Sequence, residues 1–223
     1  DIHAVSRPAK QVGGDLYDYF MLNEDEFGFA IGDVSGKGVP AALFMSTTIS
    51  QMRSVAMLDT SLNYIVNVIN RSLIRNGNTS MFVTFFAGVL NLNTRRLRFC
   101  NAGHPYPIII KPDGTVEMFK TADNLPLGVS SDYEYEEQEC YFASGSQLLL
   151  YSDGVTEAQN EDAKFYKIDR LFQFVEENKN LSSKELVEKI IAHVDAYAGK
   201  AEQSDDLTVM SLRYEKQKGV RWL

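Results

Sequence analysis

The sequence predicts an α+β fold in which two antiparallel sheets pack together and helices lie outside them. Three observations favour this fold: β-rich stretches are joined by short turns, helical stretches come in pairs, and each pair stands between runs of strands. Short connections such as "LNTRRL" and "KPDGTV", the latter with an Asp-Gly hairpin signal, are typical of antiparallel sheet. Helix pairs between runs of strands also differ from the strand-helix alternation of a doubly wound parallel sheet.

Period-two patterning and β-branched or aromatic residues predict about nine strands. They cover 15–22, 27–34, 82–92, 96–100, 106–111, 115–119, 133–141, 147–152 and 207–214. Helical spacing predicts four helices, with a proline near the start of the first, Ser61 as the cap of the second and a capping box in the "SSKE" that opens the last. These helices cover 40–58, 61–75, 168–177 and 182–198.

Composition limits the class of protein. With 223 residues, of which 44% are hydrophobic and 23% charged, the chain can bury a substantial core as one domain. The net charge of -8 argues against nucleic acid and against direct contact with an anionic membrane, because both partners need clustered Lys and Arg. Two cysteines are too few for a disulfide framework, which favours a reducing, cytoplasmic compartment.

The chain reads as one continuous unit without a linker. We expect a single domain over residues 1–215, followed by a tail, "KQKGVRWL", over residues 216–223. No apolar run reaches the roughly 18 residues that span a bilayer, and no signal peptide opens the chain. Because the sequence starts without Met, we expect a part of a longer protein, such as the cytoplasmic part of a larger signalling protein.

Acidic residues recur at one kind of position, at the end of a predicted strand and beside Gly or a second Asp. Convergence of several carboxylates in one place would be repulsive unless a divalent cation neutralised them. Glycine would let the backbone bend sharply there and bring a carbonyl oxygen close to the same ion. The positions are Asp15 in "GGD", Asp33 in "GDVSGKG", Asp153 in "YSDGVTEA", and Asp205 and Asp206 in "SDDLTV".

Oxygen ligands indicate which ion such a site would hold. Carboxylates suit Mg²⁺ or Mn²⁺, whereas zinc sites normally use Cys or His, and the histidines here, His3, His104 and His193, have no metal-ligand spacing. The stretch "GDVSGKG" is neither a calcium-binding EF-hand loop nor a P-loop. Two hard cations activate water and neutralise phosphoryl oxygens, so the pattern favours phosphate-ester hydrolysis.

Each motif alone also has a plainer interpretation. An Asp before Gly is ordinary turn chemistry, and only the convergence of several such positions favours a metal site. His104 in "NAGHPYP" is either a general acid or, more commonly for such a turn residue, a hydrogen-bonded structural residue. No Ser, Cys or His constellation for covalent catalysis stands out.

The motifs, taken in order, resemble those of a known family. "RPAKQVGGDLYDYF", "FAIGDVSGKGVPAALFMS", "LRFCNAGHPYPIII", "LLLYSDGVTEAQN" and "DDLTVMSLRY" are similar to the motifs of the SpoIIE/RsbU branch of the PPM (protein phosphatase 2C-like) metal-dependent serine/threonine phosphatases. The resemblance extends from about residue 1 to residue 214. It implies a four-layer α-β-β-α sandwich with two or more Mn²⁺ or Mg²⁺ ions at one end of the paired sheets.

The resemblance also implies roles for individual residues. Asp33 resembles the carboxylate that bridges two metals, with the Val34 carbonyl as a further ligand. Asp153 and Asp205 resemble the other direct ligands of one metal, and Asp15 resembles the acidic residue beside the other metal. On this assignment the four aspartates are catalytic, and a hydroxide held between the metals attacks phosphoserine or phosphothreonine without a phosphoenzyme.

Four further positions are less directly matched. Asp206 is similar to the second position of the last family motif, as a metal ligand or an orienter of metal-bound water, and Asp18 is assigned a supporting role. Arg7 and Lys10 lie where relatives hold the substrate phosphate and are the phosphate-binding candidates, although neither matches clearly.

The resemblance implies partners as well. The family's usual substrate is a phosphorylated STAS-domain protein, an anti-anti-sigma factor, and the domain usually follows a sensor or receiver domain; a homodimer is a further candidate assembly. One departure is "AKFYKIDRL", where Tyr166 and Lys167 replace a segment that typically contains Gly, so we expect a tight turn to be lost. The alternatives are a PPM-fold module that binds partners without turnover, and a metal-dependent phosphodiesterase or nuclease.

Overall fold

The structure, a computed structural model, describes residues 1–57, 61–76 and 81–215. The predicted tail, residues 216–223, and the predicted last residue of the first helix, Leu58, lie outside the described residues. Ten strands form two five-stranded sheets. The first sheet has the order β1-β10-β9-β6-β7 and consists of β1 (Ile2–Arg7), β6 (Ile108–Ile110), β7 (Val116–Met118), β9 (Gln147–Tyr151) and β10 (Leu207–Arg213).

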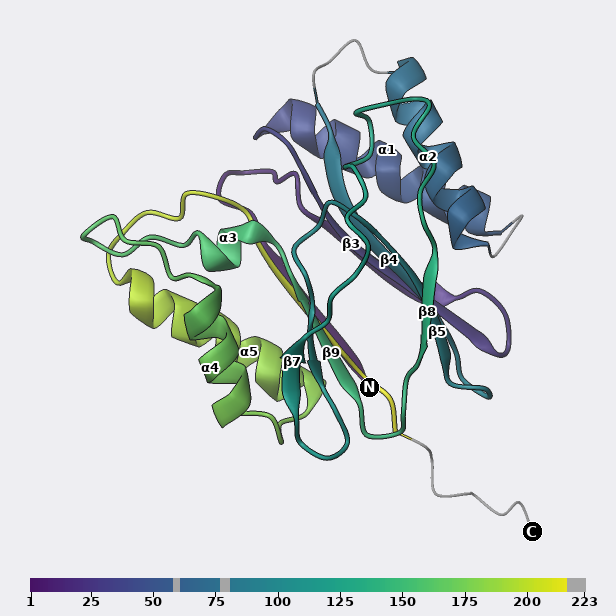
Figure 1. Ribbon diagram of the computed structural model, residues 1–223. Helices are drawn as coiled ribbons and strands as arrows, with labels where there is room; N and C mark the ends of the chain where they lie inside the picture. Colours follow the sequence, from purple (N-terminus) through teal and green to yellow (C-terminus); the bar gives the residue numbers. More distant parts are fainter. Residues whose placement is uncertain (58–60, 77–80, 216–223) are drawn as a thin grey trace.

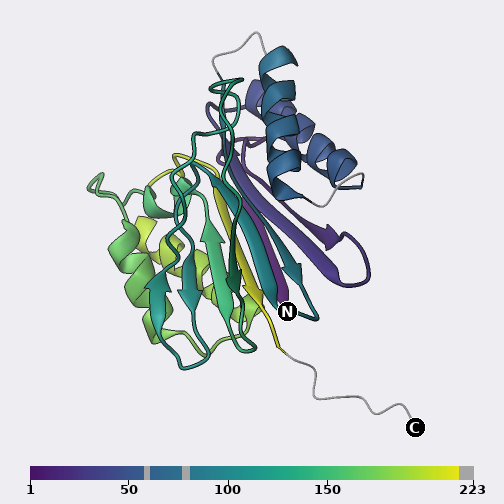
Figure 2. The same cartoon turned by 45° about the vertical axis from the view of Figure 1, so that its right-hand side comes forward.

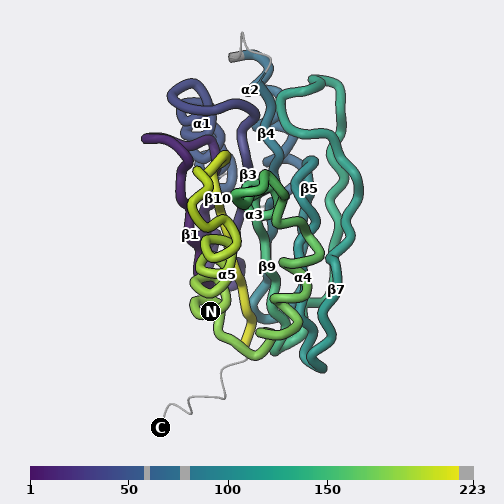
Figure 3. Tube along the Cα trace, turned by 90° about the vertical axis from the view of Figure 1, so that its left-hand side faces the viewer, coloured from purple at the N-terminus to yellow at the C-terminus, as the bar shows by residue number. Residues whose placement is uncertain are grey.

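The second sheet has the order β2-β3-β4-β5-β8, and every neighbouring pair in both sheets is antiparallel. Its strands are β2 (Leu16–Met21), β3 (Glu26–Val34), β4 (Val83–Asn91), β5 (Arg96–Ala102) and β8 (Gln138–Tyr141). Figure 3 shows β1 beside β10, so strands from the two ends of the described chain share one sheet.

Helix pairs cover the outer faces of the two sheets (Figures 1 and 2). Helices α1 (Val39–Ala56) and α2 (Leu62–Asn76) lie on the second sheet, and α4 (Ile168–Glu177) and α5 (Ser183–Ala198) lie on the first. The predicted four-layer α-β-β-α sandwich is therefore confirmed. No helix of the described ranges combines the length and the hydropathy that crossing a bilayer requires.

Three clusters of buried apolar side chains hold the four layers of the sandwich together, one at each contact between neighbouring layers. Phe85 and Phe86 are neighbours in β4, and because successive strand residues face opposite ways, Phe85 packs beneath α1 and α2 while Phe86 packs between the sheets. Both side chains are fully buried. Leu148 and Met210 of the first sheet complete the layer between the sheets, and Leu171 of α4 belongs to the third layer.

Most predicted elements are present with small shifts at their ends, but the strand predicted over 133–141 is confirmed only from Gln138 on, as β8. Ser182 caps α5 as expected: its Oγ accepts from the Glu185 backbone N–H at 3.3 Å, and the Glu185 carboxylate accepts from the Ser182 N–H at 3.1 Å. Two elements were not predicted, β1 and the single turn α3 (Asp153–Thr156). The expected loss of a tight turn near Lys167 stays a prediction; Lys167 adopts φ 69°, a conformation normally left to glycine, just before α4.

Candidate active site

The fold brings the ends of strands from both sheets to one rim. Asp15 immediately precedes β2 and Asp33 is the penultimate residue of β3, so both belong to the second sheet. Asp153 opens α3, separated from the end of β9 by Ser152, and Asp205 lies two residues before β10, so both adjoin strands of the first sheet. The buried Ser152 joins the two sheets here, because its Oγ donates to Asp15 Oδ2 at 2.7 Å.

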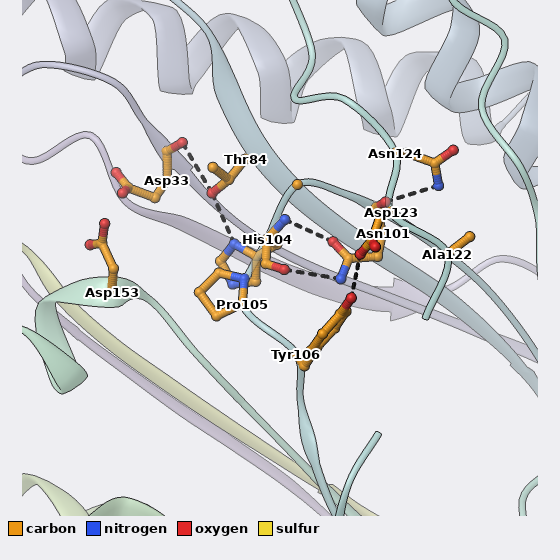
Figure 4. Close-up of a pocket in the computed structure, with 11 residues that line it drawn as sticks. Asp33, Thr84, Asn101, His104, Pro105, Tyr106, Ala122, Asp123, Asn124 and Asp153 are labelled. Carbon is orange, nitrogen blue, oxygen red and sulfur yellow. Dashed lines mark hydrogen bonds between the residues drawn. The ribbon is translucent and has the colours of Figure 1, made fainter. Parts of the chain in front are cut away.

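Asp33 lies at the electrostatic centre of this rim. Burial raises the pKa of Asp33 well above its ordinary value, and the negative charges of Asp15, Asp153 and Asp205 raise it further. Figure 4 shows the Asp33 and Asp153 carboxylates pointing toward one another. The structure therefore brings together the four carboxylates that the sequence assigned to catalysis.

Asp15 supplies the observation that tests whether a cation fits. Its side chain is only 7% exposed, and burial raises its pKa. Oδ2 accepts from Ser152, whereas Oδ1 is buried without a hydrogen-bond partner. A buried, unpartnered carboxylate oxygen beside other carboxylates is costly unless a proton or a cation satisfies it, so an oxygen-liganded hard cation fits this donor set.

The four carboxylates are not arranged around a single point. Within residues 1–57, 61–76 and 81–215, no three side chains of His, Cys, Asp or Glu are gathered as a metal-binding group.

Asp205 and Asp206 are adjacent but have different surroundings. Asp205 Oδ2 is paired with Lys37 Nζ at 2.9 Å. Asp206 instead accepts hydrogen bonds from the backbone N–H groups of Ala9 at 2.7 Å and Gly14 at 2.6 Å, with a longer contact of 3.4 Å to the N–H of Asp15. Asp206 thus holds the segment that carries Asp15, and both its oxygens are occupied.

Neither glycine of "GGD" has a positive φ, so the predicted sharp bend is not the reason for glycine there. The reason is that other groups lie too close to leave room for a side chain. A Cβ on Gly13 would lie 2.5 Å from Asp206 Oδ2. The short side chain therefore makes room for the Asp206 carboxylate.

The remaining predicted residues lie in other contacts. Asp18 forms two hydrogen bonds of 2.6 Å with the guanidinium of Arg53 on α1. Arg7 binds both carboxylate oxygens of Asp195 on α5, at 2.9 and 2.6 Å. Lys10 is exposed. Phosphate binding by Arg7 and Lys10 stays a prediction. For Arg7, the guanidinium would first have to leave Asp195 on α5.

A cavity of about 370 Å³ opens beside Asp33 and Asp153. His104 lines it and is almost fully buried, and burial lowers the pKa of His104 to about 3. Thr84 Oγ1 lies 3.0 Å from His104 Nδ1 and 3.5 Å from the Asp33 carbonyl oxygen (Figure 4). These contacts favour the structural interpretation of His104 over the general-acid interpretation.

Sequence reasoning missed three residues of this rim: Ser152, Thr84 and Lys37. Ser152 and Lys37 stand inside quoted motifs, "YSDG" and "GDVSGKG", so nearness to Asp153 and Asp33 was an available signal. Thr84 has no local signal, since only the pairing of β3 with β4 sets it opposite Asp33.

Comparison with known proteins decides the family. The family model described as Stage II sporulation protein E (SpoIIE) matches residues 23–215. The chain belongs to the SpoIIE family. It is similar to phosphoserine phosphatase RsbU of Bacillus subtilis, with 34% identity over 190 residues that cover 85% of this chain and 56% of that protein. Phosphoserine phosphatase RsbP of the same organism is 25% identical over 209 residues, covering 89% of this chain and 48% of RsbP.

Solved structures show the same fold for this SpoIIE-family chain. The SiaA-PP2C domain of Pseudomonas aeruginosa superimposes with a TM-score of 0.86 at 21% identity, covering 96% of this chain and 86% of that one. The PP2C phosphatase domain of SpoIIE from Bacillus subtilis, solved with a fragment of its regulatory domain, gives a TM-score of 0.77 at 20% identity, covering 96% of this chain and 63% of that one. The chain thus spans about half the length of its curated relatives RsbU and RsbP and has the PP2C fold.

Proposed function

We propose that this chain is the catalytic domain of a metal-dependent protein phosphatase that hydrolyses phosphoserine and phosphothreonine. The observation that carries the proposal is the rim itself: the partly buried Asp33 lies near three further carboxylates, from segments that adjoin both sheets. Membership of the SpoIIE family, and the similarity to relatives named phosphoserine phosphatases, support this reaction over phosphodiester or nucleic-acid cleavage. The net charge of -8 argues in the same direction.

Asp33, Asp153 and Asp205 would hold Mn²⁺ or Mg²⁺, with Asp15 and the Val34 carbonyl at the second ion. Bound there, such ions supply Lewis acidity for phosphate-ester hydrolysis. The protein's own part is to hold these carboxylates close together in a partly buried site, where burial raises the pKa of Asp15 and Asp33 and a bound cation would favour their charged forms. Ser152 fixes Asp15 by a 2.7 Å hydrogen bond, and Asp206 fixes the backbone of the same segment.

The cavity beside Asp33 and Asp153 would receive the phosphorylated residue. Its volume of about 370 Å³ suits a phosphorylated side chain and a neighbouring residue. The substrate we propose is a small STAS-domain protein phosphorylated on serine or threonine, a proposal supported by the similarity to RsbU. Control by a sensor or receiver domain and assembly into a homodimer stay predictions.

The test uses the purified chain with Mn²⁺ and p-nitrophenyl phosphate, followed by a serine-phosphorylated STAS domain. We expect Mn²⁺-dependent phosphate release that EDTA abolishes and that Asp33→Asn or Asp153→Asn lowers at least 100-fold, on the order of the loss when charge stabilisation is removed. Asp162→Asn is the control, because Asp162 is exposed in a surface pair with Lys164. Wild-type activity in either site variant, or cleavage of bis-p-nitrophenyl phosphate instead, would contradict the proposal. Binding of the STAS domain without turnover would identify a binding module.

A further inference from the structure

Lys37 stands in the loop between β3 and α1, and its neighbours shape that loop. Gly36 has φ 100° and Gly38 has φ 78°, conformations that L-residues rarely adopt. A Cβ on Gly38 would meet nothing within 4 Å, so backbone conformation and not crowding is the reason for glycine there. The two glycines turn the chain so that the Lys37 side chain lies over the segment that precedes β10.

The Lys37 ammonium group is bound in two ways. Its Nζ lies 2.9 Å from Asp205 Oδ2 and also donates to the backbone carbonyl of Ser204. The other oxygen of Asp205, Oδ1, accepts from the Asp206 N–H at 2.9 Å. Both oxygens of the Asp205 carboxylate therefore have a partner, and one of these partners is a positive charge.

Lys37 is the cation of this rim. Two arginines form ion pairs elsewhere: Arg7 with Asp195, and Arg53 with Asp18. Among the ion pairs of residues 1–57, 61–76 and 81–215, the pair with Lys37 is the one that involves Asp15, Asp33, Asp153 or Asp205. Its charge also lowers the pKa of Asp153 against the larger effect of burial. Lys37 thus does for these carboxylates part of what a divalent cation would do.

We propose that Lys37 is an internal counter-ion that competes with the catalytic cation for Asp205 and is displaced when that cation binds. The proposal rests on the proposed function, because it takes Asp205 as a ligand. An ammonium group 2.9 Å from Oδ2 and a divalent cation on the same carboxylate would repel each other, so the ion enters only as the Lys37 contact opens. The Lys37 side chain is 41% exposed, so water can solvate the released ammonium.

This competition sets the affinity of the site. In the metal-free protein Lys37 relieves repulsion among the carboxylates, and each entering ion must replace that interaction. Removing the ammonium while keeping the length of the side chain should therefore tighten ion binding. We expect Lys37→Met to bind Mn²⁺ about three- to tenfold more tightly, the range that a partly exposed ion pair can supply.

The experiment measures free Mn²⁺ by electron paramagnetic resonance during titration of the full chain. It compares the wild type with Lys37→Met, Asp205→Asn and the double variant, and thermal melting of each metal-free protein verifies folding. If Lys37 acts through Asp205, Lys37→Met tightens binding in the wild-type background and has no effect in the Asp205→Asn background. Lys37→Arg, which keeps the charge, should retain the wild-type affinity within about twofold. Lys111→Met is the matched control, since Lys111 is 43% exposed and pairs with Glu117 at 2.7 Å, and it should leave Mn²⁺ affinity unchanged.

Two results would overturn the proposal: unchanged or weaker Mn²⁺ binding by Lys37→Met, or a tightening that persists in the Asp205→Asn background, which would indicate a general field effect. Failure of the proposed function looks different, because the wild-type chain would then bind no Mn²⁺ and release no phosphate.

Discussion

Asp206 and Gly14 are 192 positions apart in the sequence, yet Asp206 Oδ2 accepts the Gly14 backbone N–H at 2.6 Å. The contact is buried, and the same carboxylate also accepts from the N–H of Ala9. One side chain from the last motif thus fixes the backbone that carries Asp15 from the first motif. Its contribution to the site is positional.

Asp206→Ala should therefore lower both stability and cation affinity. The substitution leaves backbone N–H groups of Ala9 and Gly14 without their acceptor, at a cost of about 1–3 kcal/mol for each buried group. Urea denaturation would measure the stability change, and Mn²⁺ titration would measure the effect on the site. The exposed Asp162→Ala is the control. Wild-type stability with loss of ion binding would instead make Asp206 a ligand, as the family resemblance allowed.

Gly154→Ala tests the contact between α3 and the segment before β10. A Cβ on Gly154 would lie 1.9 Å from the Asp206 backbone oxygen, so the chain around Asp153 must shift. We expect destabilisation of about 3 kcal/mol or failure to accumulate as soluble protein, because overpacking against backbone has no flexible group to yield. Gly114→Ala serves for comparison: the nearest atom to a Cβ there would be Nζ of the flexible Lys179 side chain at 3.4 Å, and the Gly114 φ of 82° should cost about 1 kcal/mol. Equal stability of the two variants would show that the Gly154 contact relaxes.

Asp18→Asn distinguishes a supporting role in the site from a surface ion pair. Asp18 is bound by Arg53, whose side chain is 53% exposed and also lies over the Phe20 ring at 4.8 Å. After allowance for solvent screening, an exposed pair of this kind contributes about 0–1 kcal/mol. The expected result is a small loss of stability in urea with Mn²⁺ affinity and phosphate release within about twofold of wild type. A tenfold loss of either would place Asp18 in support of the site.

Local patterns predicted the strands, the helices and the carboxylates, because each depends on neighbouring residues. An Asp beside a Gly at the end of a predicted strand, for instance, indicates where Asp33 and Asp153 lie relative to β3 and β9. What depends on distant residues was not predicted. Strand β1 is a short strand at the edge of its sheet, and only its pairing with β10, about 200 residues later, stabilises it. Helix α3 is one turn of "DGVT", too short for helical periodicity to appear.

The different contacts of Asp205 and Asp206 also depend on distant residues and were not predicted. Both residues are aspartates and they are adjacent in the chain, so the sequence predicted both as metal ligands. Their difference comes from long-range partners, Lys37 for Asp205 and the backbone of Ala9 and Gly14 for Asp206. Arg7 illustrates it too, since its engagement by Asp195 depends on the packing of α5 against β1.

His104 should make the folded state sensitive to acid. Burial lowers its pKa to about 3 in the folded protein, compared with about 6.5 in an unfolded chain. Between these values the unfolded chain binds more protons, so the free energy of unfolding falls as the pH is lowered through this window, by at most about 1.4 kcal/mol per pH unit. His104→Asn keeps a side-chain group that can hydrogen-bond Thr84 near the position of Nδ1 and removes the titrating ring.

Urea denaturation from pH 7 to pH 4 would therefore show a shallower loss of stability in His104→Asn than in the wild type. Asp15 and Asp33 act in the opposite direction, because their raised pKa values make the folded state the better proton binder, but their contribution is common to both proteins and cancels in the difference. His3→Asn, at a partly exposed position of β1, controls for loss of a histidine as such. Parallel pH profiles for His104→Asn and wild type would mean that the pKa of His104 is the same in the folded and unfolded states. His104 would then again be a candidate general acid.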